Sequence, residues 1–129
     1  MSEPKILLVE DEQIAGMDIR EMIKEAGYES VTLKNTAESA LDYINSDSVN
    51  LVLMDINLPG EKDGIEAARE INQNHGIPLI YLTAFSDEET LRRARSTQPA
   101  GFLVKPVTRA DVKASIEMAL GNSTKPSQE

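Results

Sequence analysis

Short apolar runs recur along the chain, and segments with helical periodicity lie between them. The runs comprise residues 6–9, 30–33, 51–54, 79–82 and 102–104. Three of them are continuously apolar rather than alternating, which is typical of strands buried on both faces of a parallel sheet. We therefore predict five strands, and we expect the second to lie at an edge of the sheet.

The segments between the runs carry apolar residues at spacings of three and four, as amphipathic helices do. Gly27 is a stop signal for the first helix, and the third helix must end before Pro78 because proline disfavours a helical residue before it. The residues predicted to cap or begin the second to fifth helices are Thr36, Gly64, Ser86 with Glu89, and Thr108 with Asp111.

This strict alternation of strand and helix predicts an α/β fold of the flavodoxin-like, doubly wound (βα)5 type. The expected architecture is a five-stranded parallel sheet in the order 2-1-3-4-5, with helices on both faces and right-handed crossovers. Residues 1–121 are expected to form a single domain, because the length suits one core. Residues 122–129 are polar and are interpreted as a tail or the start of a linker.

Polar side chains follow four of the predicted strands. Glu10 and Asp11 come after the first, Asp55 after the third, Thr83 after the fourth and Lys105 after the fifth. Because the carboxyl ends of parallel strands meet at one edge of a sheet, we expect these side chains to converge. The expected meeting point is the switch between the first and third strands.

Three converging carboxylates indicate a cation. An acid after a strand is often only part of a helix start, which is our interpretation of Glu12. Asp55 is different, because it stands between an apolar run and Ile56. Two like charges about 5 Å apart repel by roughly 3 kcal/mol at an effective dielectric of ~20. With no histidine or cysteine close by, oxygen ligands favour a hard ion such as Mg²⁺.

The remaining groups suit phosphate chemistry. The Lys105 ammonium can pair with a phosphoryl oxygen, and the Thr83 hydroxyl can donate to one. A metal, a carboxylate nucleophile, a hydroxyl and an ammonium together describe a phosphoryl-transfer pocket in which an aspartyl phosphate forms. The chain has neither a Walker motif nor a dinucleotide-binding glycine motif, so nucleotide binding of those kinds is not expected.

Four motifs resemble the receiver domain of response regulators in two-component signalling, of the chemotaxis-receiver type. They are Glu10-Asp11, Asp55 within the sequence LMDINLPG, Thr83-Ala84, and FLVKP at residues 102–106. Each stands at the end of its predicted strand and in the order of that family, and the resemblance covers about residues 4–121. It implies a phosphorylation-dependent switch, which catalyses only its own phosphorylation and slow dephosphorylation and is not otherwise an enzyme.

The resemblance also implies a role for each matching position. Asp55 is the expected phosphoacceptor, supplied by the phosphohistidine of a sensor histidine kinase or a phosphotransfer protein. Glu10, Asp11, Asp55 and the backbone carbonyl of Asn57 are the expected ligands of Mg²⁺, with Mn²⁺ as a possible substitute. Glu10 departs from the family pattern, since many relatives have Asp there, and the loop of residues 57–64 is one residue longer than usual.

The other matching positions belong to the switch itself. Thr83 and Lys105 are expected to contact the phosphoryl group, Phe102 to turn inward on activation, and the Lys105–Pro106 bond to be cis. The output surface implied by the resemblance is formed by the fourth helix, fifth strand and fifth helix, and it meets a downstream partner or a second copy. The fourth helix adds a basic spot there with Arg92, Arg93 and Arg95; a plain solvated helix face explains this spot equally well.

Composition limits the partners and the setting. Asp and Glu number 22 against 13 Lys and Arg, a net charge of −9. A binder of nucleic acid or of an anionic membrane would need a basic face, so neither partner is expected. Cysteine is absent, which is compatible with the cytoplasm and excludes thiolate chemistry.

Three alternatives stay open at this point. The chain is either a stand-alone receiver or a module cut from a hybrid kinase or effector protein. A pseudo-receiver that serves only as an interaction module is disfavoured by the intact site. An acid-nucleophile phosphatase of the haloacid dehalogenase type needs a second aspartate two positions after the nucleophile, where this chain has Asn57.

Overall fold

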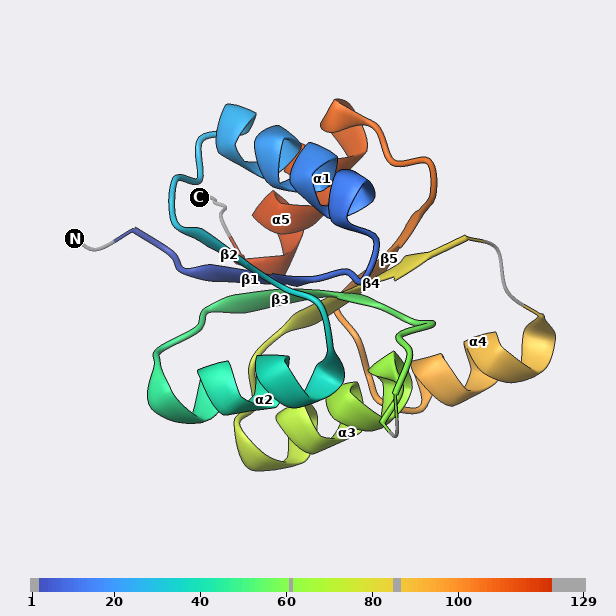
Figure 1. The fold of residues 1–129 in the computed structure, drawn as a ribbon. Coiled ribbons are helices and arrows are strands. Elements are labelled where there is room, and N and C mark those ends of the chain that lie inside the picture. The colour runs from blue at the N-terminus through green and yellow to red at the C-terminus, as the bar shows by residue number, and fades with distance from the viewer. Residues whose placement is uncertain (1–2, 61, 85–86, 122–129) are drawn as a thin grey trace.

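Five parallel strands form one sheet, and five helices cover its two faces (Figure 1). The structure is a computed structural model, and it describes residues 3–60, 62–84 and 87–121. The strands are β1 (Ile6–Val9), β2 (Val31–Lys34), β3 (Leu51–Asp55), β4 (Leu79–Thr83) and β5 (Gly101–Val104). Their order is β2-β1-β3-β4-β5, with every neighbouring pair parallel, so the predicted fold class and strand order are confirmed.

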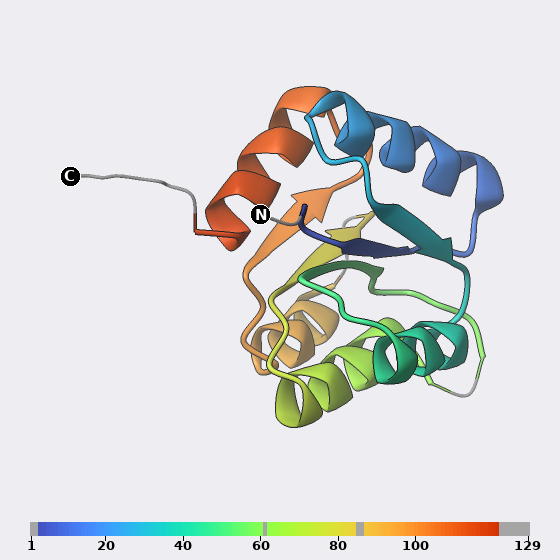
Figure 2. The ribbon, with the colours of Figure 1, turned by 90° about the vertical axis from the view of Figure 1, so that its left-hand side faces the viewer.

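The helices form one layer on each side of the sheet. They are α1 (Gln13–Glu25), α2 (Ala37–Ser46), α3 (Gly64–Asn74), α4 (Glu88–Arg95) and α5 (Arg109–Ala119). Helices α1 and α5 lie together on one face, while α2, α3 and α4 lie on the other (Figure 2). None of the helices in the described residues is long and apolar enough to cross a membrane.

Two apolar clusters, one on each face of the sheet, form the core. Within β1, Leu7 and Val9 belong to the cluster that contains α2 and α3, whereas Ile6 and Leu8 belong to the cluster that contains α1 and α5. Both faces of the strand are therefore buried, which explains why its sequence is continuously apolar. Strand β2 is an edge strand, and all four of its residues are only half-buried.

Most of the predicted helix caps are present. The side chain of Thr36 accepts a hydrogen bond from the Ser39 amide at the start of α2, and that of Thr108 accepts one from Asp111 at the start of α5. At α3, the cap is Asp63, whose carboxylate and that of Glu66 form a reciprocal capping box just before the expected Gly64. These bonds satisfy amides at helix starts that have no partner within the helix.

Helix α4 begins later than the sequence pattern predicts. Its cap is Asp87, whose side chain accepts a hydrogen bond from the Thr90 amide, and the helix starts at Glu88. Ser86, the predicted cap, lies outside the described residues, as does the predicted tail, residues 122–129. The predicted cap for α4 was wrong by one position, because the carboxylate of Asp87 accepts the bond from the Thr90 amide and an acid is also favourable at a helix start.

Strands β3 and β4 each extend one residue further than their apolar runs. As a result, Asp55 and Thr83 are the last residues of these strands rather than the first residues of loops. The strand register pairs Asp55 with Leu82 and Thr83 with Val104. Because a strand holds its backbone through ladder hydrogen bonds on each side, the two polar side chains stand on a rigid edge of the sheet.

Candidate functional site

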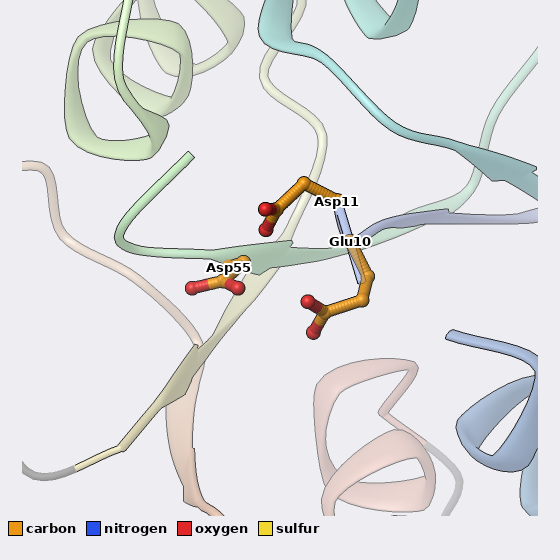
Figure 3. A group of neighbouring side chains, drawn as sticks. All are labelled: Glu10, Asp11 and Asp55. Carbon is orange, nitrogen blue, oxygen red and sulfur yellow. The ribbon is translucent and has the colours of Figure 1, made fainter. Parts of the chain in front are cut away.

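Three carboxylates meet at the carboxyl edge of the sheet (Figure 3). Glu10 and Asp11 stand in the turn between β1 and α1, and Asp55 ends β3. One carboxylate oxygen from each lies within 4.8 Å of the others. Glu10 and Asp55 are buried, with 1% and 6% of their surfaces exposed, whereas Asp11 is exposed. The site therefore combines two buried acids with one acid that is exposed to solvent.

Asp55 is held by groups on both sides of its carboxylate. Its Oδ1 accepts a hydrogen bond of 2.9 Å from the Asn57 amide, and its Oδ2 accepts one of 3.0 Å from Nζ of Lys105. Behind it, Gly64 lies so close that an added Cβ would stand 2.0 Å from the Asp55 carbonyl oxygen. The start of α3 therefore packs directly on the backbone of Asp55 and fixes it in place.

Lys105 pairs with two buried carboxylates at once. Its Nζ lies 2.8 Å from Oε1 of Glu10 as well as 3.0 Å from Oδ2 of Asp55. Burial alone would lower the pKa of Lys105, but the hydrogen bonds and charges of Glu10 and Asp55 outweigh it and raise that pKa. The lysine is therefore charged at neutral pH and is the cation that the described residues bring to the acidic group.

The contact with Lys105 does not fully offset the burial of the Glu10 carboxyl group, so the pKa of Glu10 is raised. Burial raises the pKa of its carboxyl, the contact with Lys105 opposes that rise, and the negative charge of Asp55 adds to it. Its Oε2 accepts a hydrogen bond of 3.2 Å from the Glu12 amide. Its buried Oε1 lies 2.8 Å from Nζ of Lys105 and has no further partner among the described residues.

The donor set of this site fits a hard divalent cation. All three side chains offer carboxylate oxygens, the ligands that Mg²⁺ prefers, and the buried Oε1 of Glu10 has only the ion pair with Lys105, which Lys105 shares with Asp55. Two oxygens bound to one Mg²⁺ lie at most about 4.2 Å apart, twice the ~2.1 Å coordination distance. The spacing of up to 4.8 Å is somewhat larger than that limit, so the acids would hold a small ion partly through water ligands.

The other predicted site residues surround this group. Thr83 is buried at the end of β4, with 3% exposure, and its carbonyl accepts a hydrogen bond of 2.7 Å from the Lys105 amide. The peptide bond between Lys105 and Pro106 is cis. The side chain of Asn57 is exposed, while its backbone belongs to the turn that follows Asp55.

Phe102 lies within β5, three residues before Lys105. It is half-buried, and its ring stacks on Tyr81 of β4 with centroids 5.6 Å apart and an angle of 28° between the rings. Nothing in the sequence singles out Tyr81, which is a tyrosine within an otherwise apolar buried strand. Its hydroxyl has no exposed surface and therefore needs a hydrogen-bond partner, which only the structure reveals.

Comparison with known families assigns most of the chain to one of them. The sequence model of the response regulator receiver domain matches residues 6–117. The chain belongs to this family. The predicted resemblance is thereby confirmed, and the chain is a receiver domain, a module that is generally a signalling switch rather than a catalytic enzyme.

Similar proteins include several longer regulators. The transcriptional regulatory protein PdtaR of Mycobacterium tuberculosis is 37% identical over 116 residues, which are 90% of this chain and 56% of PdtaR. ZraR of Escherichia coli, also a transcriptional regulatory protein, is 32% identical over 119 residues, 92% of this chain and 26% of ZraR. The chain thus spans about half or less of the length of these relatives.

Solved structures of receivers share the fold. The receiver domain of a modulated diguanylate cyclase from Desulfovibrio desulfuricans superimposes with a TM-score of 0.86 at 33% identity, covering 92% of this chain and 94% of that one. A CheY-like receiver protein from Methanospirillum hungatei gives a TM-score of 0.85 at 26% identity, with the same shares covered. Both similarities cover nine-tenths of this chain and show the same fold.

Proposed function

We propose that the chain is a phosphorylation-dependent switch whose phosphoacceptor is Asp55. The donor is the phosphohistidine of a sensor histidine kinase or of a phosphotransfer protein, and the reaction depends on Mg²⁺. The observation that carries this proposal is the position of the Asp55 carboxylate, which is 6% exposed and held between the Asn57 amide and the Lys105 ammonium. Two further carboxylates stand within 4.8 Å of it.

In the transfer step, a carboxylate oxygen of Asp55 attacks phosphorus and the bond between phosphorus and the imidazole nitrogen breaks. The electron pair of that bond leaves with the imidazole, which takes up a proton. Lys105, already 3.0 Å from Asp55, pairs with the negative oxygens of the phosphoryl group as it arrives. This pairing supports the transition state without a large movement of the lysine.

The proposed metal ligands are Asp11, Asp55, Glu10 and the backbone carbonyl of Asn57. When bound, Mg²⁺, or Mn²⁺ in its place, neutralises the clustered carboxylates and the incoming phosphoryl charge. Glu10, whose Oε1 lies 2.8 Å from Nζ of Lys105, is longer than aspartate and would hold the ion through water. Asp11 is exposed and therefore accessible to an ion that enters from solvent.

The output of the switch is proposed to be the surface of α4, β5 and α5. In this proposal, Thr83 moves toward the phosphoryl group and Phe102 turns inward. Two large apolar side chains are exposed on the β5 and α5 part, Val104 at 57% and Met118 at 83%, as an interaction surface requires. A downstream partner protein or a second copy binds there, and the net charge of −9 supports neither nucleic acid nor an anionic membrane as a partner.

The proposal places the reaction in the cytoplasm. It is tested by incubating the chain with acetyl phosphate and Mg²⁺ and measuring the intact mass. We expect one added phosphoryl group, which Asp55→Asn abolishes and EDTA prevents. Asp18→Asn, which alters an exposed aspartate of α1, is the matched control and should be labelled like wild type.

Circular dichroism of each variant shows whether the fold persists. An unlabelled wild type, or an Asp55→Asn variant that still gains the phosphoryl group, would refute the proposal. Transfer from a phosphorylated histidine phosphotransfer domain in place of acetyl phosphate then tests the class of donor.

A further inference from the structure

Helix α4 is attached to the sheet differently from the other helices. Of its eight residues only Ala94 is buried, whereas each of the other four helices buries at least two. Five of the eight are charged, namely Glu88, Glu89, Arg92, Arg93 and Arg95. With so little apolar surface buried, packing alone contributes little to holding α4 in place.

The C-terminal end of α4 is fixed by polar contacts of Thr97, two residues past the helix. Thr97 is buried, and its backbone carbonyl accepts a hydrogen bond of 3.1 Å from the amide side chain of Asn72 in α3. Its hydroxyl donates a hydrogen bond of 2.7 Å to the carbonyl of Ala94 and lies 2.6 Å from the hydroxyl of Tyr81.

The direction of the bond between the two hydroxyls follows from the protons available. Thr97 has one hydroxyl proton, and the Ala94 carbonyl, which can only accept, takes it. Tyr81 must therefore be the donor to Oγ1 of Thr97. Because burial raises the pKa of the Tyr81 hydroxyl, the proton stays on it throughout the neutral range.

Tyr81 also contacts the position that the family resemblance assigns to the switch. Its ring has no exposed surface and stacks on Phe102, 5.6 Å away between centroids. In β4 it stands two residues before Thr83, so both side chains project from the same face of the sheet. One side chain thus touches the end of α4 through its hydroxyl and Phe102 through its ring.

We propose that Tyr81 is a positioning residue that fastens the C-terminal end of α4 to β4 and holds the ring of Phe102, so that the two are coupled. A change in the rotamer of Phe102 then reaches α4 through Tyr81 and Thr97. This coupling goes beyond the proposed phosphoacceptor function. It is a property of the unphosphorylated chain, so it is testable whether or not Asp55 accepts a phosphoryl group.

Hydrogen exchange measured by mass spectrometry tests the fastening of α4. Tyr81→Phe removes only the donor hydroxyl, and we expect amide exchange in peptides of residues 88–98 to become about fivefold faster. Peptides of α5 serve as the internal reference and should be unchanged. Tyr43→Phe is the matched control, because it removes a hydroxyl that bonds Thr32 at 3.0 Å beside the opposite sheet edge.

Two results would overturn the fastening. One is α4 exchange in Tyr81→Phe that stays within the error of wild type. The other is an increase of equal size in α4 and α5, which would indicate general destabilisation. Thr97→Ser, which keeps the hydroxyl, should exchange like wild type, and a fast-exchanging Thr97→Ser variant would also contradict the role of the hydroxyl pair.

Ring signals in NMR spectra test the coupling to Phe102. The chain has two phenylalanines, Phe85 and Phe102, so a sample with labelled phenylalanine gives two sets of ring signals, assigned with Phe102→Leu. Thr97→Val removes the acceptor for Tyr81, and we expect the Phe102 signals to shift. Thr32→Val, the control at the opposite edge, should leave them in place. Unshifted Phe102 signals in Thr97→Val would refute the coupling.

Discussion

The ammonium group of Lys105 lies 2.8 Å from Oε1 of Glu10, although these residues are 95 positions apart in the sequence and follow the first and the last strand. The same group lies 3.0 Å from Asp55. One cation thus serves two buried carboxylates, and each acid receives only part of its charge. A second cation at this edge of the sheet, such as the Mg²⁺ of the proposed function, would balance the remaining negative charge.

Removing that shared cation should cost stability. In Lys105→Met, two buried carboxylates lose their partner, and we expect the free energy of unfolding at neutral pH to fall by about 2 kcal/mol. This is less than for a fully buried pair, because the lysine side chain is 23% exposed. Urea denaturation in EDTA measures the change. Lys113→Met, at an exposed position on α5, is the control, and an equal loss in both variants would contradict the prediction.

The sequence predicts the arrangement of the fold well, because each level of pattern agrees. Buried parallel strands are continuously apolar, their connections are helical, and polar residues such as Asp55 and Lys105 directly follow the runs. Strand ends were less predictable: the apolar pattern stops at Met54 and Leu82, whereas the ladder continues for one residue in each strand. Hydrogen bonds to neighbouring strands, which a single sequence does not show, decide where a strand ends.

Pairwise contacts within the site were beyond the sequence. The sequence predicts that the acids and Lys105 converge. It does not predict that the ion pair of Lys105 with Glu10 is shorter than its ion pair with Asp55. The contact between Tyr81 and Thr97 was not anticipated either, because it depends on how the segment after α4 returns to β5. Side-chain packing across sixteen residues of chain leaves no periodic signal in the sequence.

The pH dependence of stability should reveal the burial of Glu10. Its pKa is raised above the ordinary 4.5, so between pH 4.5 and its folded value the native state holds a proton that the unfolded state has lost. The contribution of Glu10 is therefore present below pH 4.5 and is lost as pH rises through the folded pKa. We expect the unfolding free energy of wild type to fall relative to that of Glu10→Gln over this window.

The measurement is urea denaturation of both proteins in EDTA at a series of pH values from 4 upward. The difference between the two curves isolates Glu10, since the other carboxylates are common to both. A difference that grows in favour of wild type as pH rises would mean that Lys105 more than compensates the burial, contrary to the expectation.

Binding of Mg²⁺ should stabilise the chain through Asp11. Because an ion that binds only the folded state raises its stability, saturating Mg²⁺ should raise the melting temperature of wild type. We expect a clearly smaller rise for Asp11→Ala. The control is Glu12→Ala, which removes the neighbouring exposed carboxylate but none of the three clustered acids. Equal rises in wild type and Asp11→Ala would mean that the ion binds elsewhere.

Gly64 is predicted to be indispensable for the position of Asp55. An added Cβ would stand 2.0 Å from the Asp55 carbonyl oxygen and 3.0 Å from that of Ile56, and both are backbone atoms that no side-chain rotation can move aside. In Gly64→Ala, the start of α3 must shift away from β3. We expect a loss of about 3 kcal/mol in the free energy of unfolding.

The comparison that isolates this effect is Gly101→Ala in β5. An added Cβ there meets no atom within 4 Å, so the substitution should leave stability nearly unchanged or raise it slightly. Urea denaturation of the two variants, followed by labelling with acetyl phosphate, separates packing from chemistry. Because the shift of α3 also displaces the end of β3, Gly64→Ala should label more slowly than Gly101→Ala even under conditions where both are folded. Equal stability of the two variants would show that α3 adapts without disturbing Asp55.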